Sequence, residues 1–180
     1  MVDFKFRNFE NSDTLLLEEL DSDPEVMKYI SNGIPSDKSE IERATNVMLS
    51  WKSKLDGKYG YWIIEDQKTS EFIGWFHLRP LHAEPNNTTK LELGYRIKRK
   101  FWGKGIATKG SKLLIEKAFY ELSANEVWAH AMKSNIASTK VMEKCQLIYH
   151  HEDVYQDFPG PDKRCVWYVI NKEKLLGTAL

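Results

Sequence analysis

Residues 91–107 read Leu-Glu-Leu-Gly-Tyr-Arg-Ile-Lys-Arg-Lys-Phe-Trp-Gly-Lys-Gly-Ile-Ala, and the fold is decided in this stretch. Its first half alternates with the period of two that is typical of a strand. The apolar face carries Leu91, Leu93, Tyr95 and Ile97, and the polar face carries Glu92, Gly94 and Arg96. A basic run with Gly103 and Gly105 follows, and apolar residues at helical spacing continue to about Leu122. The predicted order is strand, glycine-rich loop, helix.

The start of this helix suits an anion. The first backbone N–H groups of a helix have no intrahelical partners, and the helix dipole adds partial positive charge there. Gly103 and Gly105 allow a ligand to approach the backbone closely. The loop is not a Walker A motif, and Thr108 stands where a GxGxxG motif needs its third glycine. The alternative interpretation is a plain helix entry with two turn glycines and a solvated basic run.

The segments on either side predict a mixed sheet. Before the stretch, a strand near residues 4–9 precedes two helical segments and two strands, at about residues 59–65 and 71–78. After it come a strand at about 126–131, a helix from Asn135 to about Cys145, and two further strands. The order β-α-α-β-β-β-α-β-α-β-β predicts an α/β (α+β) fold, a mixed, mostly antiparallel twisted sheet flanked by helices.

Composition limits the functional classes. The 180 residues are 42% apolar, which predicts one domain over residues 1–180. Lys plus Arg and Asp plus Glu each total 26, so no global charge favours a nucleic-acid or membrane partner. Residues 1–7 lack the apolar segment of a secretion signal, and no run reaches the length of a membrane span. We therefore expect a cytoplasmic protein whose two cysteines, Cys145 and Cys165, are reduced.

Residues 91–107 resemble strand four and the acetyl-CoA loop of the GNAT N-acetyltransferases, whose loop pattern is Gln/Arg-x-x-Gly-x-Gly/Ala. Gly105 and Ala107 match the pattern, whereas Trp102 stands where Gln or Arg is usual. That substitution is common in the branch resembling the ribosomal-protein N-acetyltransferases (RimJ/RimL-like). The expected order of elements also matches the GNAT fold over nearly the whole chain.

The resemblance implies acetyl-CoA as the cosubstrate. Amides from about Gly103 to Thr108 would hold the pyrophosphate of the coenzyme, and the strand end would pair with pantetheine. The implied acetyl-CoA-binding residues are Tyr95, Arg96, Ile97, Trp102, Gly103, Lys104, Gly105, Ile106, Ala107, Thr108 and Asn135. A local concentration of lysines and Arg99 between residues 98 and 112 agrees with a phosphorylated ligand, although each single side chain is solvated in the alternative interpretation.

A second constellation is Asn135-Ile-Ala-Ser138, which resembles the Asn-x-x-Ser helix of the same branch. In the family the Asn contacts pantetheine, and the hydroxyl of Ser138 could protonate or orient the leaving thiolate. The alternative is plain helix capping. Many relatives carry a tyrosine acid where this chain has Met142, so Ser138, water, or a tyrosine such as Tyr149 or Tyr155 takes that role.

A departure from the family pattern also follows this helix. Gln146 stands where the family's Lys-x-Gly-Phe ending has glycine. Because glycine commonly ends a helix, the departure bears on the C-cap rather than on the chemistry.

Glu92 is the candidate base. Acetyl transfer to an amine requires a proton to leave an ammonium group, and a carboxylate or an ordered water accepts it. The comparable glutamate acts in several relatives, often through water. The alternative is an exposed strand residue paired with Arg96. His150 and His151 are expected to point to opposite faces of a strand, and we expect no metal.

These observations predict an acetyl-CoA-dependent N-acetyltransferase that uses direct attack in a ternary complex. A free α-amine costs roughly 1.4 kcal/mol to deprotonate at pH 7, against roughly 4.6 kcal/mol for a lysine amine. We therefore expect an N-terminal α-amine of a protein or peptide, with a small-molecule amine (polyamine, antibiotic or amino acid) as the alternative. The rivals are a non-catalytic coenzyme A sensor and a nucleic-acid-binding module. Either a monomer or a homodimer fits this expectation.

Overall fold

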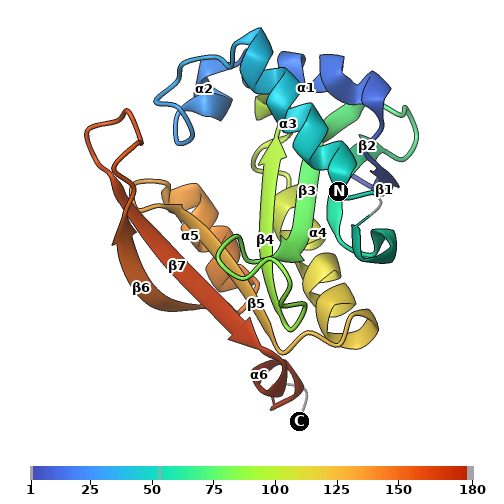
Figure 1. The fold of residues 1–180 in the computed structure, drawn as a ribbon, viewed down its shortest axis with the longest axis vertical. Coiled ribbons are helices and arrows are strands. Elements are labelled where there is room, and N and C mark those ends of the chain that lie inside the picture. Colours follow the sequence, from blue (N-terminus) through green and yellow to red (C-terminus); the bar gives the residue numbers. More distant parts are fainter. Residues whose placement is uncertain (1, 53, 178–180) are drawn as a thin grey trace. The chain divides into compact units, whose positions relative to one another are not determined.

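A computed structural model describes residues 2–52 and 54–177 (Figure 1). Within these residues, seven strands form one sheet in the order β1-β2-β3-β4-β5-β7-β6. The strands are β1 (Phe4–Asn8), β2 (Gly60–Asp66), β3 (Phe72–Pro80), β4 (Lys90–Ile97), β5 (Glu126–Met132), β6 (Ile148–Val154) and β7 (Arg164–Asn171). The helices are α1 (Thr14–Asp21), α2 (Pro24–Met27), α3 (Lys38–Ser50), α4 (Ile106–Glu116), α5 (Ile136–Lys144) and α6 (Lys172–Gly177).

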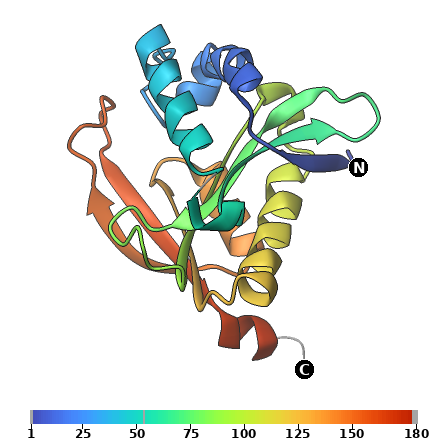
Figure 2. The ribbon, with the colours of Figure 1, turned by 45° about the vertical axis from the view of Figure 1, so that its right-hand side comes forward.

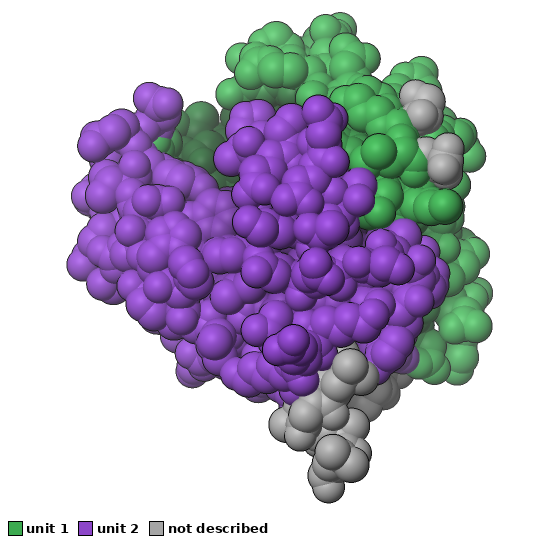
Figure 3. Space-filling model, turned by 60° about the horizontal axis from the view of Figure 1, so that its bottom comes forward, with its two compact units in different colours: residues 1–77, 95–106, 158–160 green, residues 78–94, 107–157, 161–180 purple. Residues whose placement is uncertain are grey.

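The chain divides into two compact units, coloured separately in Figure 3. The first comprises residues 1–77, 95–106 and 158–160, and the second comprises residues 78–94, 107–157 and 161–180. Both β3 and β4 pass from one unit to the other, as does α4 just after its first residue.

Two amphipathic helices cover the sheet of the first unit. Figure 2 shows α1 and α3 side by side, and they bury Leu17, Leu20 and Ile41 in one cluster with Ile63 of β2. Asp37 begins α3 with a reciprocal capping box, because its side chain accepts from the Glu40 amide while the Glu40 carboxylate accepts from the Asp37 amide. The capping residue and the apolar periodicity therefore explain where α3 starts and which face it buries.

The second unit is built on the antiparallel strands β5, β7 and β6. Residues Glu126 to Met132 pair with Asn171 to Cys165, and α5 packs on β5 (Figure 1). Alternate residues of β5, Val127, Ala129 and Ala131, are buried, which leaves Trp128 and His130 on the opposite face.

The predicted order of elements is confirmed, and two short helices add to it. α2 begins at Pro24, because Asp23 accepts from the Glu25 amide and Pro24 occupies the first turn. The expected helical stretch to about Leu122 is confirmed in extent: α4 covers Ile106–Glu116, and a π-helical turn continues over Lys117–Glu121. Among the described residues, none belongs to a helix long and apolar enough to span a membrane.

Candidate active site

The glycine-rich loop leaves its backbone accessible. Gly103 and Gly105 have φ angles of 72° and 77°, in the left-handed region that favours glycine. A Cβ built on either one meets no other atom within 4 Å, so the space above the loop is open. α4 begins at the next residue, Ile106. Accessible amides at a helix start fit a pyrophosphate, and a side chain at Gly105 would project into that space.

Trp102 connects this loop to the end of β4 through a hydrogen bond. Its indole Nε1 donates to the Ile97 carbonyl over 2.7 Å, while about half of the residue stays exposed. Lys100 and Lys104 lie over the Phe101 ring at 5.2 and 5.0 Å. The residue that departs from the family's loop pattern therefore holds the loop through a backbone contact.

The side chain of Arg96, at the end of β4, has partners within the protein. Arg96 pairs with Asp21 and lies over the Trp75 ring at 5.3 Å. β3 approaches closely here, because a Cβ on Gly74 would lie 2.2 Å from the Arg96 carbonyl oxygen. Tyr95 packs against Phe76 with 5.4 Å between ring centroids. A role for residues 95–97 in holding a ligand therefore falls to their backbone.

Glu92 is buried, and its partner is not the one considered from the sequence. Its carboxylate Oε1 accepts from Arg79 Nη2 over 3.1 Å and lies 3.8 Å from His130 Nδ1. The alternative of an exposed pair with Arg96 is wrong, because β4 turns the Glu92 side chain toward β3 and β5 neighbours.

Strands β4 and β5 both extend beyond the residues through which they pair. The parallel register of β4 and β5 runs from Lys90↔Glu126 to Glu92↔Trp128. β4 continues to Ile97 and β5 to Met132. Backbone groups beyond Glu92 are thus placed where a ligand chain could pair with β4.

Arg79 and His130 are site residues that the sequence reasoning missed. Both share a sheet face with Glu92, and the His130 ring lies 4.4 Å from Trp167 and 5.7 Å from Tyr155. The alternation of β5 could have placed His130 on a face with Trp128. Arg79 had no comparable signal, because its contact with Glu92 depends on the pairing of β3 with β4.

At the start of α5, the structure separates the roles of two predicted residues. Asn135 is the N-cap, and its Oδ1 accepts from the Ser138 amide over 3.2 Å. Ser138 is half-buried, and no hydrogen bond of its hydroxyl is recorded among the described residues. Capping therefore rests on Asn135 and leaves the hydroxyl of Ser138 available.

The two tyrosines named as alternative acids lie in different surroundings. Tyr155 contacts the His130 ring, and burial, together with the neighbouring Cys165, raises the pKa of its phenol. Tyr149 is exposed and packs on Tyr168 with 5.9 Å between centroids. Of the two, Tyr155 is the one grouped with Glu92.

Both cysteines are free thiols. Both are buried, and burial raises the pKa of Cys145 and of Cys165 to about 11. Cys145 Sγ lies 3.6 Å from the Thr108 carbonyl, which ties the end of α5 to the first turn of α4.

The expectation that His150 and His151 point to opposite faces is wrong. The register of β6 shifts between Tyr149 and His151, and such a bulge re-aims side chains. Both rings consequently contact Trp128, and their Nδ1 atoms lie 2.7 Å apart. Among residues 2–52 and 54–177 the structure contains no group of three or more side chains suited to a metal.

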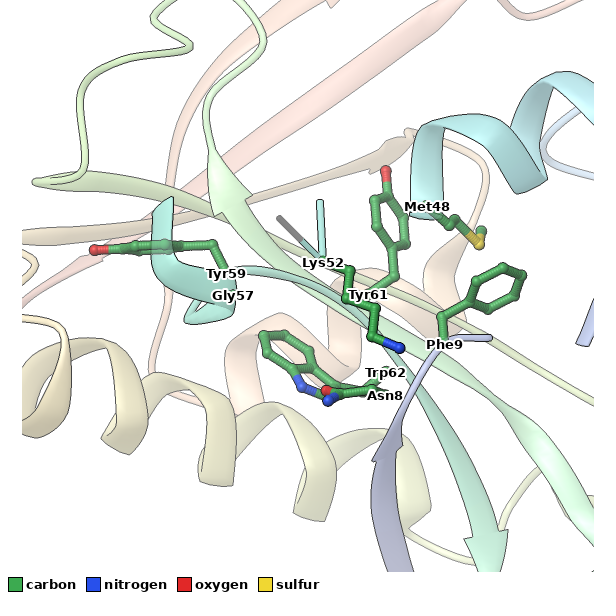
Figure 4. A pocket seen from close by; sticks show the side chains of 8 residues that line it. All are labelled: Asn8, Phe9, Met48, Lys52, Gly57, Tyr59, Tyr61 and Trp62. Atoms are coloured by element: carbon green, nitrogen blue, oxygen red, sulfur yellow. The ribbon is translucent and has the colours of Figure 1, made fainter. Parts of the chain in front are cut away.

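A pocket of about 270 Å³ lies in the first unit (Figure 4). Half of its lining is aromatic. The lining comes from the ends of β1 and α3 and from β2 and the turn before it: Asn8, Phe9, Met48, Lys52, Gly57, Tyr59, Tyr61 and Trp62. None of the candidate acetyl-CoA or catalytic residues is in this lining.

Known structures share the fold. A GNAT-family acetyltransferase from Bacillus anthracis superposes with a TM-score of 0.76 at 20% identity, covering 96% of this chain and 98% of that one. Spermidine N-acetyltransferase from Vibrio cholerae, in complex with CoA and spermine, gives a TM-score of 0.75 at 20% identity with the same coverage. The predicted mixed, mostly antiparallel sheet with flanking helices is confirmed.

Sequence comparisons show the family of the chain as well as its fold. FsC-acetyl coenzyme A-N(2)-transacetylase of Aspergillus fumigatus is 33% identical over 166 residues, which cover 88% of this chain and 69% of that protein. The uncharacterized protein YkkB of Bacillus subtilis is 33% identical over 130 residues, 71% of each chain. The sequence model of the acetyltransferase (GNAT) domain matches residues 3–148. The chain therefore belongs to the GNAT family of acetyl-CoA-dependent N-acetyltransferases.

Proposed function

We propose that this enzyme transfers the acetyl group of acetyl-CoA to the N-terminal α-amine of a protein or peptide. The amine attacks the thioester directly in a ternary complex. The buried cysteines support direct transfer, because a thiol whose pKa lies near 11 is a poor nucleophile at neutral pH.

The observation that carries the choice of acceptor is the buried pair of Glu92 and Arg79. The guanidinium balances the carboxylate, so the pair does not attract a multiply charged cation such as a polyamine. A positive charge also disfavours a second cation beside it. An acceptor that is already partly neutral at pH 7 suits this environment, and an α-amine meets that condition.

Each predicted acetyl-CoA residue has a role consistent with its surroundings. The amides of Gly103 to Thr108, with Lys104 beside them, would hold the pyrophosphate, and Trp102 would keep the loop in place. The backbone of Tyr95 to Ile97 would pair with pantetheine and polarise the thioester carbonyl. Asn135, besides capping α5, would contact pantetheine.

The catalytic roles fall to Glu92 and Ser138. Glu92 would accept the proton of the amine, either directly or through an intervening group. The hydroxyl of Ser138 would protonate or orient the coenzyme A thiolate as the C–S bond breaks. Tyr155 is the alternative donor, since its raised pKa keeps the phenol protonated at neutral pH.

A small-molecule amine is the second candidate acceptor. The names of two similar proteins favour it, one an FsC N(2)-transacetylase and the other a spermidine N-acetyltransferase.

The proposal also includes four expectations from the sequence. They are membership of the RimJ/RimL-like branch, a single domain over residues 1–180, a cytoplasmic location, and a monomeric or homodimeric state.

Thiol release from acetyl-CoA, measured over a panel of acceptors, tests this function. The panel includes peptides with free and formylated N-termini, polyamines, aminoglycosides and free amino acids. We expect the highest kcat/KM for free N-terminal peptides. Faster turnover of a polyamine would support the second candidate, and acetyl-CoA binding without turnover of any amine would support a coenzyme A sensor.

A further inference from the structure

Glu92 belongs to a row of side chains that crosses one face of the second unit. The register pairs Glu92 with Trp128, and His130 lies two residues further along β5 on the same face. On the other side of β5, His130 pairs with Trp167 of β7. Arg79 of β3 completes the row through its contact with Glu92.

Burial distinguishes Glu92 from His130. The Glu92 side chain is 5% exposed, whereas that of His130 is 31% exposed. A proton acceptor must come within hydrogen-bond reach of the amine it deprotonates. His130 meets this requirement better than Glu92, whose buried carboxylate already accepts from Arg79.

The two ring nitrogens of His130 have different surroundings. Nδ1 is buried and lies 3.8 Å from the Glu92 carboxylate, so exchange of a proton with a ligand would use Nε2. A carboxylate at this distance stabilises the imidazolium once it forms. The neighbours of the ring include Trp167 and Tyr155, and His151 stacks on Trp167 at the far end of the row.

We propose that His130 is the group that takes the proton from the acceptor amine, and that Glu92 and Arg79 are its positioning residues. The inference rests on the proposed acetyl transfer and specifies how the proton moves. As the amine nitrogen bonds to the acetyl carbon, its proton passes to His130 Nε2. The C–S bond then breaks, the coenzyme A thiolate gains a proton, and His130 returns its proton to solvent.

Rate profiles against pH test the assignment with the protein acetylating a free N-terminal peptide. His130→Gln should lower kcat/KM by about 100-fold and abolish the ionisation on the acidic limb. Glu92→Gln should lower kcat/KM while the acidic limb persists. His151→Gln, a matched control on the same face, should leave both unchanged.

Two further measurements keep the result interpretable. The acetyl-CoA dissociation constant of each variant, measured by calorimetry, should match that of the wild type and show that the fold is intact. Added imidazole should restore activity to His130→Gly, which a purely structural histidine would not allow. If Glu92→Gln loses the acidic limb and His130→Gln keeps it, Glu92 is the direct base and the inference is overturned. Failure of the wild-type enzyme to acetylate any amine would instead overturn the proposed function.

Discussion

The hydroxyl of Ser138 can be removed without changing the start of the helix that carries it. Because Asn135 provides the cap of α5, removal of the Ser138 hydroxyl leaves the helix start intact. Ser138→Ala should therefore lower kcat by about 10-fold or more while the affinity for acetyl-CoA stays unchanged, since a contact to the thiolate strengthens only in the transition state. Steady-state kinetics with calorimetry checks this, with Ser134→Ala, at an exposed neighbouring position, as the control. Equal turnover would reduce Ser138 to a helix-start residue.

The two cysteines give a prediction about pH. A thiol whose pKa is raised to about 11 carries almost no thiolate at pH 8. Alkylation of the folded protein by iodoacetamide should be about 100-fold slower than that of a peptide thiol at pH 8, and should accelerate about tenfold per pH unit below pH 11. Mass spectrometry over time measures the rate, and the unfolded protein serves as the control. Rapid labelling at pH 8 would remove the argument for direct transfer.

At the scale of elements, the loop before α4 depends on two left-handed residues. Gly105→Val places a branched side chain where φ is 77° and where the backbone faces open space. The variant should lose the rise in melting temperature that acetyl-CoA causes. Gly33→Val, which strains a turn with φ of 80° elsewhere, should be destabilised yet keep that rise. An undiminished rise in folded Gly105→Val would locate the pyrophosphate elsewhere.

The end of α5 holds a strained residue. Gln146 has φ of 65° and its amide donates to the Glu143 carbonyl, while the Leu147 amide donates to Met142, as in a Schellman motif. Gln146→Gly should stabilise the protein by about 0.5–1 kcal/mol, since glycine adopts this conformation without the Cβ penalty. Thermal unfolding should show a rise of about 1–4 °C, and Gln146→Ala should show none. A fall in melting temperature for the glycine variant would contradict this reading.

Element order was predictable because periodicity and caps are local signals. The alternation in residues 91–97, the glycines before α4 and the cap at Asn135 each lie within one short stretch. The partners of Glu92 were not predictable in the same way. Arg79 and His130 reach it only through the pairing of β4 with β3 and β5, and the bulge at His150 depends on β7.

The whole molecule has no net charge, so electrostatic attraction of ligands depends on local groups of residues. The loop amides offer a site for an anion, whereas Glu92 and Arg79 form a balanced pair. This division fits an enzyme that binds a highly charged cosubstrate and an acceptor of low charge.

The identity of the acceptor nitrogen is the central claim, and one measurement addresses it directly. A peptide with a free N-terminus and one internal lysine is incubated with the enzyme and acetyl-CoA at pH 7, and fragmentation mass spectrometry locates the acetyl group. The account predicts acetylation of the α-amine, because that amine costs about 3 kcal/mol less to deprotonate than the lysine side chain. Acetyl groups confined to the lysine would contradict it.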